Sequence, residues 1–319
     1  MILQILLFFI GLSLILIGAN SLVDGSSSLA KKMGVSEFVI GLTIIGIGTS
    51  APEMVVSLIG SVKGNADIAV GNVLGSNIFN ALIILGVTSF IFPMQISDRN
   101  KKKDIPFLIL TTLLVIVLGI NHTLFGIGKN SLGRIDGIVL LLLFVFYIIN
   151  SFRIKNDDQP DSDQPIKLRK TGVSVIMILL GIGALVLGGN LFVDSAVNIA
   201  KYLHVSDKFI AITILAVGTS LPEFATSIIA ATKKRGQMAL GNVIGSNMFN
   251  LLWILGCSSV IHPLSFDKIM PMDLIMLLLS AVVILTSAFM FKKKQIDKFD
   301  GMFFLAIYGC YFVWLVMNN

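Results

Sequence analysis

Ten apolar runs recur along the 319-residue chain, and they constrain the fold more than any other feature. A helix needs about 20 apolar residues to cross roughly 30 Å of hydrocarbon. The runs lie at 2–22, 39–62, 68–92, 105–120, 135–152, 173–192, 209–232, 238–260, 272–291 and 301–316. They are too long and too uniformly apolar for membrane barrel strands, which alternate over about ten residues. The sequence therefore predicts an all-α integral membrane protein with ten transmembrane helices.

The chain also contains an internal repeat. An offset of 170 aligns residues 35–86 with 205–256 without a gap, and 26 of these 52 pairs are identical. We expect two five-helix repeats at 1–152 and 173–319, joined by a polar cytosolic linker at 153–172. Because five is odd, the second repeat must cross the membrane in the opposite sense. Inverted repeats are typical of secondary transporters, whose substrate site lies at the repeat interface near mid-membrane.

Basic residues set the expected orientation. The loops after the first, third, fifth, seventh and ninth runs hold 18 of the 24 Lys and Arg residues. The positive-inside rule places these loops in the cytosol, so we expect a multi-pass protein of the cell membrane with both termini outside. The formal charge of +6 is then a property of loops in a lipid bilayer. It indicates no nucleic-acid partner, and no obligatory protein partner is implied.

Two motifs occur twice, both within apolar runs. Gly-Thr-Ser-x-Pro-Glu lies at 48–53 and 218–223, and Gly-Asn-Val-x-Gly-Ser-Asn-x-Phe-Asn lies at 71–80 and 241–250. A carboxylate such as Glu53 or Glu223 costs at least ~2.5–3.5 kcal/mol at the bilayer centre. A protonated glutamate that is hydrogen-bonded between helices is the structural alternative. It explains a single buried glutamate better than it explains two at matched positions of a repeat. These segments contain no Lys or Arg, so the two carboxylates imply a bound cation.

The prolines predict discontinuous core helices. Pro52 and Pro222 lack the backbone N–H that a helix interior needs. We therefore expect the helices to unwind at 48–50 and 218–220, which would turn free carbonyl groups toward the site.

The candidate ligands are hard oxygen donors, as Ca²⁺ requires for its six to eight contacts. The two glutamates, the carbonyls of the neighbouring threonines and two carboxamides suit Ca²⁺, and four serine hydroxyls suit Na⁺. The full set is Glu53, Glu223, Thr49, Thr219, Ser50, Ser220, Ser76, Ser246, Asn80 and Asn250. No Cys-His cluster is present, which argues against zinc or copper. We expect Ca²⁺ and Na⁺ as transported ions and no cofactor.

At these doubled motifs the chain resembles the sodium/calcium exchanger family, within the cation/calcium antiporter superfamily, over both repeats. The resemblance implies a compact prokaryotic-type transporter and not an enzyme, with runs 2, 3, 7 and 8 forming the ion core and runs 1 and 6 sliding across it. It also implies that Glu53 and Glu223 serve both ions, that Thr49 and Thr219 serve Ca²⁺, and that the four serines serve Na⁺.

The residue at position 250 bears on which ion is exchanged for Ca²⁺. Some relatives, including potassium-dependent ones, carry aspartate where this chain has Asn250. The expected function is therefore Na⁺/Ca²⁺ antiport by alternating access, without K⁺. A proton/calcium antiporter is the main alternative, although the motifs of those relatives typically lack the Thr-Ser pair. A cation channel, which needs a continuous pore, is a further alternative. A membrane enzyme is disfavoured, because the sequence has no Ser-His-Asp, zinc-protease or phosphate-loop signature.

Overall fold

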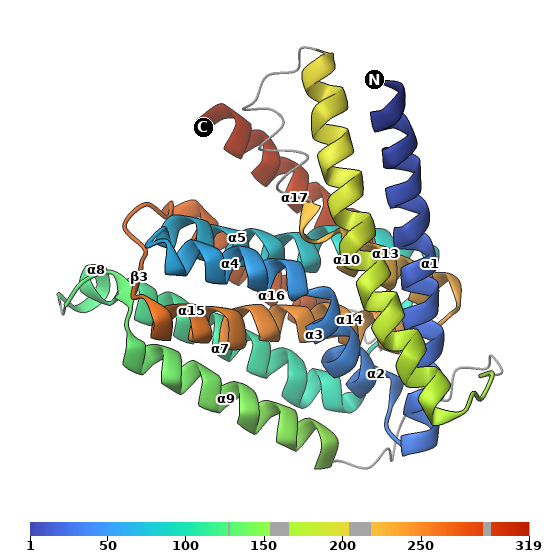
Figure 1. Cartoon of the computed structure of the whole chain (residues 1–319). Coiled ribbons are helices and arrows are strands. Elements are labelled where there is room, and N and C mark those ends of the chain that lie inside the picture. Colours follow the sequence, from blue (N-terminus) through green and yellow to red (C-terminus); the bar gives the residue numbers. More distant parts are fainter. Residues whose placement is uncertain (127, 154–165, 204–217, 290–294, 319) are drawn as a thin grey trace.

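The structure is a computed structural model that describes residues 1–126, 128–153, 166–203, 218–289 and 295–318 (Figure 1). In the first half the helices are α1 (Ile2–Met33), α2 (Glu37–Ile40), α3 (Gly46–Thr49), α4 (Ala51–Val62), α5 (Ala66–Phe79), α6 (Leu85–Ile91), α7 (Ile105–Gly119), α8 (Asn121–Phe125) and α9 (Arg134–Arg153). In the second they are α10 (Thr171–Tyr202), α13 (Leu221–Thr232), α14 (Gly236–Met248), α15 (Leu255–Ile261), α16 (Pro271–Phe289) and α17 (Lys298–Asn318). Four π-helical segments interrupt or precede them: η1 (Gly41–Ile45), η2 (Asn80–Ile84), η3 (Asn100–Asp104) and η5 (Phe249–Ile254).

The described residues form a mostly helical membrane protein. Seven helices are long and apolar enough to cross a membrane, and a bent pair formed by Glu37–Thr49 and Ala51–Val62 makes an eighth candidate. The run at 105–120 appears as the shorter helix α7. The first part of the run at 209–232 and most of the predicted linker lie outside the described residues. The ten-helix count therefore stays a prediction.

Helices α1 and α10 lie side by side and run antiparallel (Figure 1). Their contact is reciprocal and uses glycine. A Cβ atom on Gly18 would lie 2.8 Å from the Gly181 carbonyl oxygen, and one on Gly181 would lie 2.9 Å from the Gly18 oxygen. Gly11 and Gly188 form the same kind of contact, at 2.8 Å in both directions. Small residues let membrane helices approach this closely, so equivalent helices of the two halves pack backbone against backbone.

Short strands and end helices of each half also pack against the other half. Strand β1 (Met94–Gln95) pairs with β4 (Gln295–Ile296), and β2 (Ser131–Leu132) pairs with β3 (Leu264–Ser265), both antiparallel. Helix α9 of the first half packs on α15, while α17 of the second half packs on α6. Two strand pairs and two helix contacts therefore join the halves.

Burial separates an inner group of helices from an outer one. The continuous rods α5–η2–α6 and α14–η5–α15 are the most buried, and α1, α9, α10 and α17 leave most of their apolar side chains at least partly exposed. An apolar exterior is what lipid contact requires, because lipid does not hydrogen-bond to polar groups. The inner rods carry both copies of the longer motif.

Candidate ion-binding site

A short break in the helix precedes each glutamate. Helix α3 ends at Thr49, Ser50 adopts φ −80° and ψ 12°, and α4 then continues at an angle of 49° to the preceding segment. Ser220 adopts φ −87° and ψ 7° immediately before α13. The proline falls in the first turn of the new helix in both copies, where its missing N–H costs little.

The predicted unwinding at 48–50 was too wide. Gly48 and Thr49 remain helical, and only Ser50 leaves the helix. The Ser50 N–H still donates to the Gly46 carbonyl at 3.3 Å. One residue is sufficient to redirect the chain because the next helix starts at once. In the second copy, helical geometry is described at residue 218 and lost at 219 and 220.

The two carboxylates are fully buried and each accepts a hydrogen bond from the opposite half. Ser50 Oγ donates to Glu223 Oε1 at 2.7 Å, and Ser220 Oγ donates to Glu53 Oε1 at 3.1 Å. Ser76 Oγ donates to the same Glu53 oxygen at 3.4 Å. Both glutamates lie in the first turn of a helix, where the positive end of the helix dipole stabilises negative charge. The carboxylates also interact electrostatically with each other.

The remaining hydroxyl groups gather around this pair. The Thr219 side chain lies near Glu53, and those of Thr49 and Ser246 lie near Glu223. Thr49 Oγ1 donates to Asn242 Oδ1 at 3.3 Å. Ser246 Oγ also donates to the Gly46 carbonyl at 3.2 Å. All the hydroxyl residues expected from the sequence are therefore brought together.

Asn80 and Asn250 occupy matched π-helical segments, η2 and η5, at which the two inner rods bulge. Both side chains are fully buried, and neither amide has a hydrogen-bond partner among the described residues. The same holds for the Oε2 atoms of Glu53 and Glu223. Buried polar atoms in proteins almost always have a hydrogen-bond partner. The Oδ1 atoms of the two asparagines and the Oε2 atoms of the two glutamates are therefore available as ligands for a bound cation. The π-helical turns, which are common at functional sites, have no signal in the sequence motif.

Two asparagines and two serines that were not predicted as site residues support the glutamates. Asn72 Nδ2 donates to the Glu53 carbonyl at 3.2 Å and to Ser57 Oγ at 3.0 Å. Asn242 makes the equivalent bonds, to the Glu223 carbonyl at 3.3 Å and to Ser227 Oγ at 2.9 Å. All four residues are identical between the repeats, and that was the signal available in the sequence. They position the backbone of each carboxylate-bearing turn.

The charge of the site defines its chemistry. Across the described ranges, no basic side chain pairs with Glu53 or Glu223. In the same ranges, no group of three His, Cys, Asp or Glu side chains could hold a metal ion. Two carboxylates among neutral oxygens carry a charge that one Ca²⁺ or two Na⁺ would neutralise. Such oxygens suit these hard cations.

Comparison with known proteins gives the same answer. The family model described as sodium/calcium exchanger protein matches residues 3–153 and 173–317. The sodium/calcium exchanger MaX1 of Methanosarcina acetivorans is 30% identical over 340 residues, covering 97% of both chains. The uncharacterized membrane protein MJ0091 of Methanocaldococcus jannaschii is 35% identical over 305 residues, covering 94% of both.

The fold agrees as well. A solved structure of the sodium–calcium exchanger NCX_Mj matches with a TM-score of 0.84 and 32% identity, covering 98% of this chain and 99% of that one. Members of the family are ion transporters rather than enzymes. The motifs, the two-glutamate centre and these matches together place the chain in the sodium/calcium exchanger family.

Proposed function

We propose that this protein exchanges Na⁺ for Ca²⁺ across the cell membrane by alternating access. The observation that carries the proposal is the buried pair Glu53 and Glu223, each hydrogen-bonded by a serine of the opposite half. A site built from the inner helices of both halves changes its exposure when the outer helices α1 and α10 slide across it. Two bare carboxylates at this depth are costly, so crossing without a cation is disfavoured. That cost favours exchange over leak.

The proposed ligands are those expected from the motifs. Glu53 and Glu223 bind either ion, the carbonyls of Thr49 and Thr219 complete the Ca²⁺ shell, and Asn80 and Asn250 contribute the oxygens that lack other partners. The hydroxyls of Ser50, Ser76, Ser220 and Ser246 would serve Na⁺.

The proposed architecture is two inverted five-helix repeats, residues 1–152 and 173–319, joined by a cytosolic linker at 153–172. The antiparallel packing of α1 on α10 supports it, as does the reciprocal pairing of the four short strands. In this arrangement both termini are extracytoplasmic.

Potassium independence follows from Asn250. An amide offers an oxygen without charge, so the site has no third carboxylate to balance a further monovalent cation. An ionised carboxylate 4 Å from such an ion would contribute about 4 kcal/mol at an effective dielectric near 20.

The test is Ca²⁺ uptake into liposomes containing the purified protein, with an imposed Na⁺, K⁺ or proton gradient. We expect uptake driven by internal Na⁺ to persist when choline replaces K⁺. Flux that vanishes without K⁺ would contradict the Asn250 argument. Flux that ignores Na⁺ but follows a pH gradient would identify a proton/calcium antiporter, and single-channel currents would identify a channel.

A further inference from the structure

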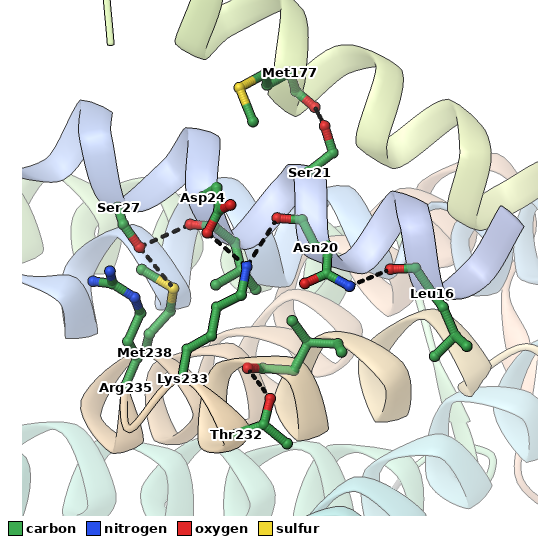
Figure 2. Close-up of polar contacts among 12 residues, drawn as sticks. Leu16, Asn20, Ser21, Asp24, Ser27, Met177, Thr232, Lys233, Arg235 and Met238 are labelled. Atoms are coloured by element: carbon green, nitrogen blue, oxygen red, sulfur yellow. Dashed lines mark hydrogen bonds and ion pairs between the residues drawn. The ribbon is translucent and has the colours of Figure 1, made fainter. Parts of the chain in front are cut away.

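An ion pair connects the outer helix α1 to the inner bundle. Lys233 is the first residue after α13, and its Nζ atom lies 2.6 Å from Asp24 Oδ1 on α1. Figure 2 shows the lysine reaching up from its turn toward α1, where it also meets the Asn20 carbonyl at 3.5 Å. The pair is partly exposed, with 26% of the lysine side chain and 39% of the aspartate side chain accessible.

The sequence repeats every member of this contact in the other half. At the offset of 170, Lys233 corresponds to Lys63, Asp24 to Asp194 and Asn20 to Asn190. The local geometry is repeated too, because Lys63 follows α4 with φ −80° and ψ 1°, and Lys233 follows α13 with φ −86° and ψ 11°. The charge bias between loops does not explain Lys63, which lies on the side expected to be poor in basic residues.

The second copy of the contact is open in this structure. Lys63 and Asp194 are both exposed, and neither forms an ion pair within the described ranges. The helices show the same asymmetry: α1 packs along α13, whereas the described parts of α10 and α4 barely touch.

We propose that Asp24–Lys233 and Asp194–Lys63 are alternating ion pairs that position the outer helices against the inner bundle, one pair in each end state of transport. The inference rests on the proposed alternating-access exchange. In an inverted-repeat transporter the two halves swap conformations between end states, so the contact made by one half in this state becomes the contact of the other half in the opposite state. Closing one pair and opening the other stabilises each end state in turn.

A neighbouring ion pair provides a matched control. Arg235, two residues beyond Lys233, pairs with Glu37 on α2. Its counterpart at position 65 is Asn65, so this contact has no charged equivalent in the other half. It joins the turn before α14 to α2, whereas the Lys233 pair joins its turn to α1.

The experiment measures the Ca²⁺ concentration for half-maximal exchange at each membrane face, using sealed vesicles of both orientations. Asp24→Asn and Lys233→Gln should favour the opposite end state, so the apparent affinity rises at one face and falls at the other by about two- to fivefold, the range for partly exposed pairs. Asp194→Asn and Lys63→Gln should shift the two faces in the opposite directions. The exchanged pair Asp24→Lys with Lys233→Asp should restore the wild-type affinities at the two faces. Arg235→Gln should not shift the affinities at the two faces in opposite directions.

Shifts of the same sign for both pairs, an absence of any effect in the Lys63 and Asp194 variants, or no recovery in the exchanged pair would overturn the proposal. A merely structural role would lower the folded amount or the maximal rate without reversing sign between the faces. A wild-type protein without Ca²⁺ flux under any gradient would instead refute the proposed function.

Discussion

At the scale of single residues, the site concentrates its charge on two side chains. Glu53 and Glu223 are fully buried, and the atoms around them are neutral hydroxyls and amides. In the proposed site each carboxylate supplies half of the charge that balances Ca²⁺. Each carboxylate accepts a hydrogen bond from a serine of the opposite half, so neither half forms the site alone.

Glu53→Gln or Glu223→Gln should abolish Ca²⁺ exchange while leaving a folded protein. For each unit of charge on the cation, losing a carboxylate 4 Å away costs about 4 kcal/mol at an effective dielectric near 20, so the affinity for divalent Ca²⁺ should fall by more than roughly a thousandfold. The measurement is Na⁺-driven Ca²⁺ uptake, with size-exclusion elution as the check on folding. Asp67→Asn is the control, because Asp67 lies outside the site and pairs with the exposed Lys268. Near wild-type uptake in either glutamine variant would contradict the proposed site.

Asn250→Asp should change ion selectivity. The carboxamide is fully buried and has no partner among the described residues, so a carboxylate there adds charge directly to the site. We expect monovalent cations to compete more strongly with Ca²⁺, which can be measured as Na⁺ and K⁺ inhibition of Ca²⁺ uptake. Asn65→Asp, in the turn before α5, is the control outside the site. Unchanged inhibition would show that Asn250 does not contact the transported ions.

At the scale of helices, the outer pair depends on close backbone contact. Gly18 and Gly181 meet each other across α1 and α10, whereas Gly183, two residues along α10, has open space where a Cβ atom would lie. Gly181 and Gly183 thus lie on different faces of α10. A larger side chain at the contact must push the helices apart.

Gly181→Leu should destabilise the protein and slow exchange, and Gly183→Leu should leave both nearly unchanged. Overpacking a close contact costs typically 1–3 kcal/mol, and a Cβ at residue 181 would already lie 2.8 Å from the Leu22 backbone nitrogen. The unfolding temperature in detergent and the uptake rate in liposomes measure the two effects. An equal loss of unfolding temperature and uptake rate in both variants would mean that the effects do not arise from the contact between α1 and α10.

At the scale of the whole molecule, the orientation of the protein in the membrane is a prediction that labelling can test. It rests on the 18-to-6 distribution of basic residues between the two sides. A cysteine placed in the 153–172 linker should be protected from a membrane-impermeant thiol reagent in intact cells. A cysteine at Ser131, in the short strand β2 before α9, should react. The background should replace the native cysteines Cys257 and Cys310, which are free. Labelling of the linker from outside would reverse the proposed topology.

The sequence by itself determined the membrane class and the internal repeat, and it identified the candidate ion-site residues. Apolar length is a one-dimensional property, and two carboxylates in apolar runs at matched positions carry a large energetic penalty that only a function explains. The resemblance to sodium/calcium exchangers rested on the same residues, and the comparisons confirmed the family.

Only the tertiary structure decided how those residues meet. The serine beside each glutamate serves the glutamate of the other half, the carboxamides lie on π-helical bulges, and Asn72 and Asn242 hold the two turns in place. Repeat identity marks two residues as equivalent, but it does not say whether a side chain bonds within its own half or across to the other. That choice depends on helix packing, and so does the closure of Asp24–Lys233 while Asp194 and Lys63 stay apart. The two halves, whose aligned segments share half of their residues, differ here, and the proposed alternating access requires such an asymmetry in each end state.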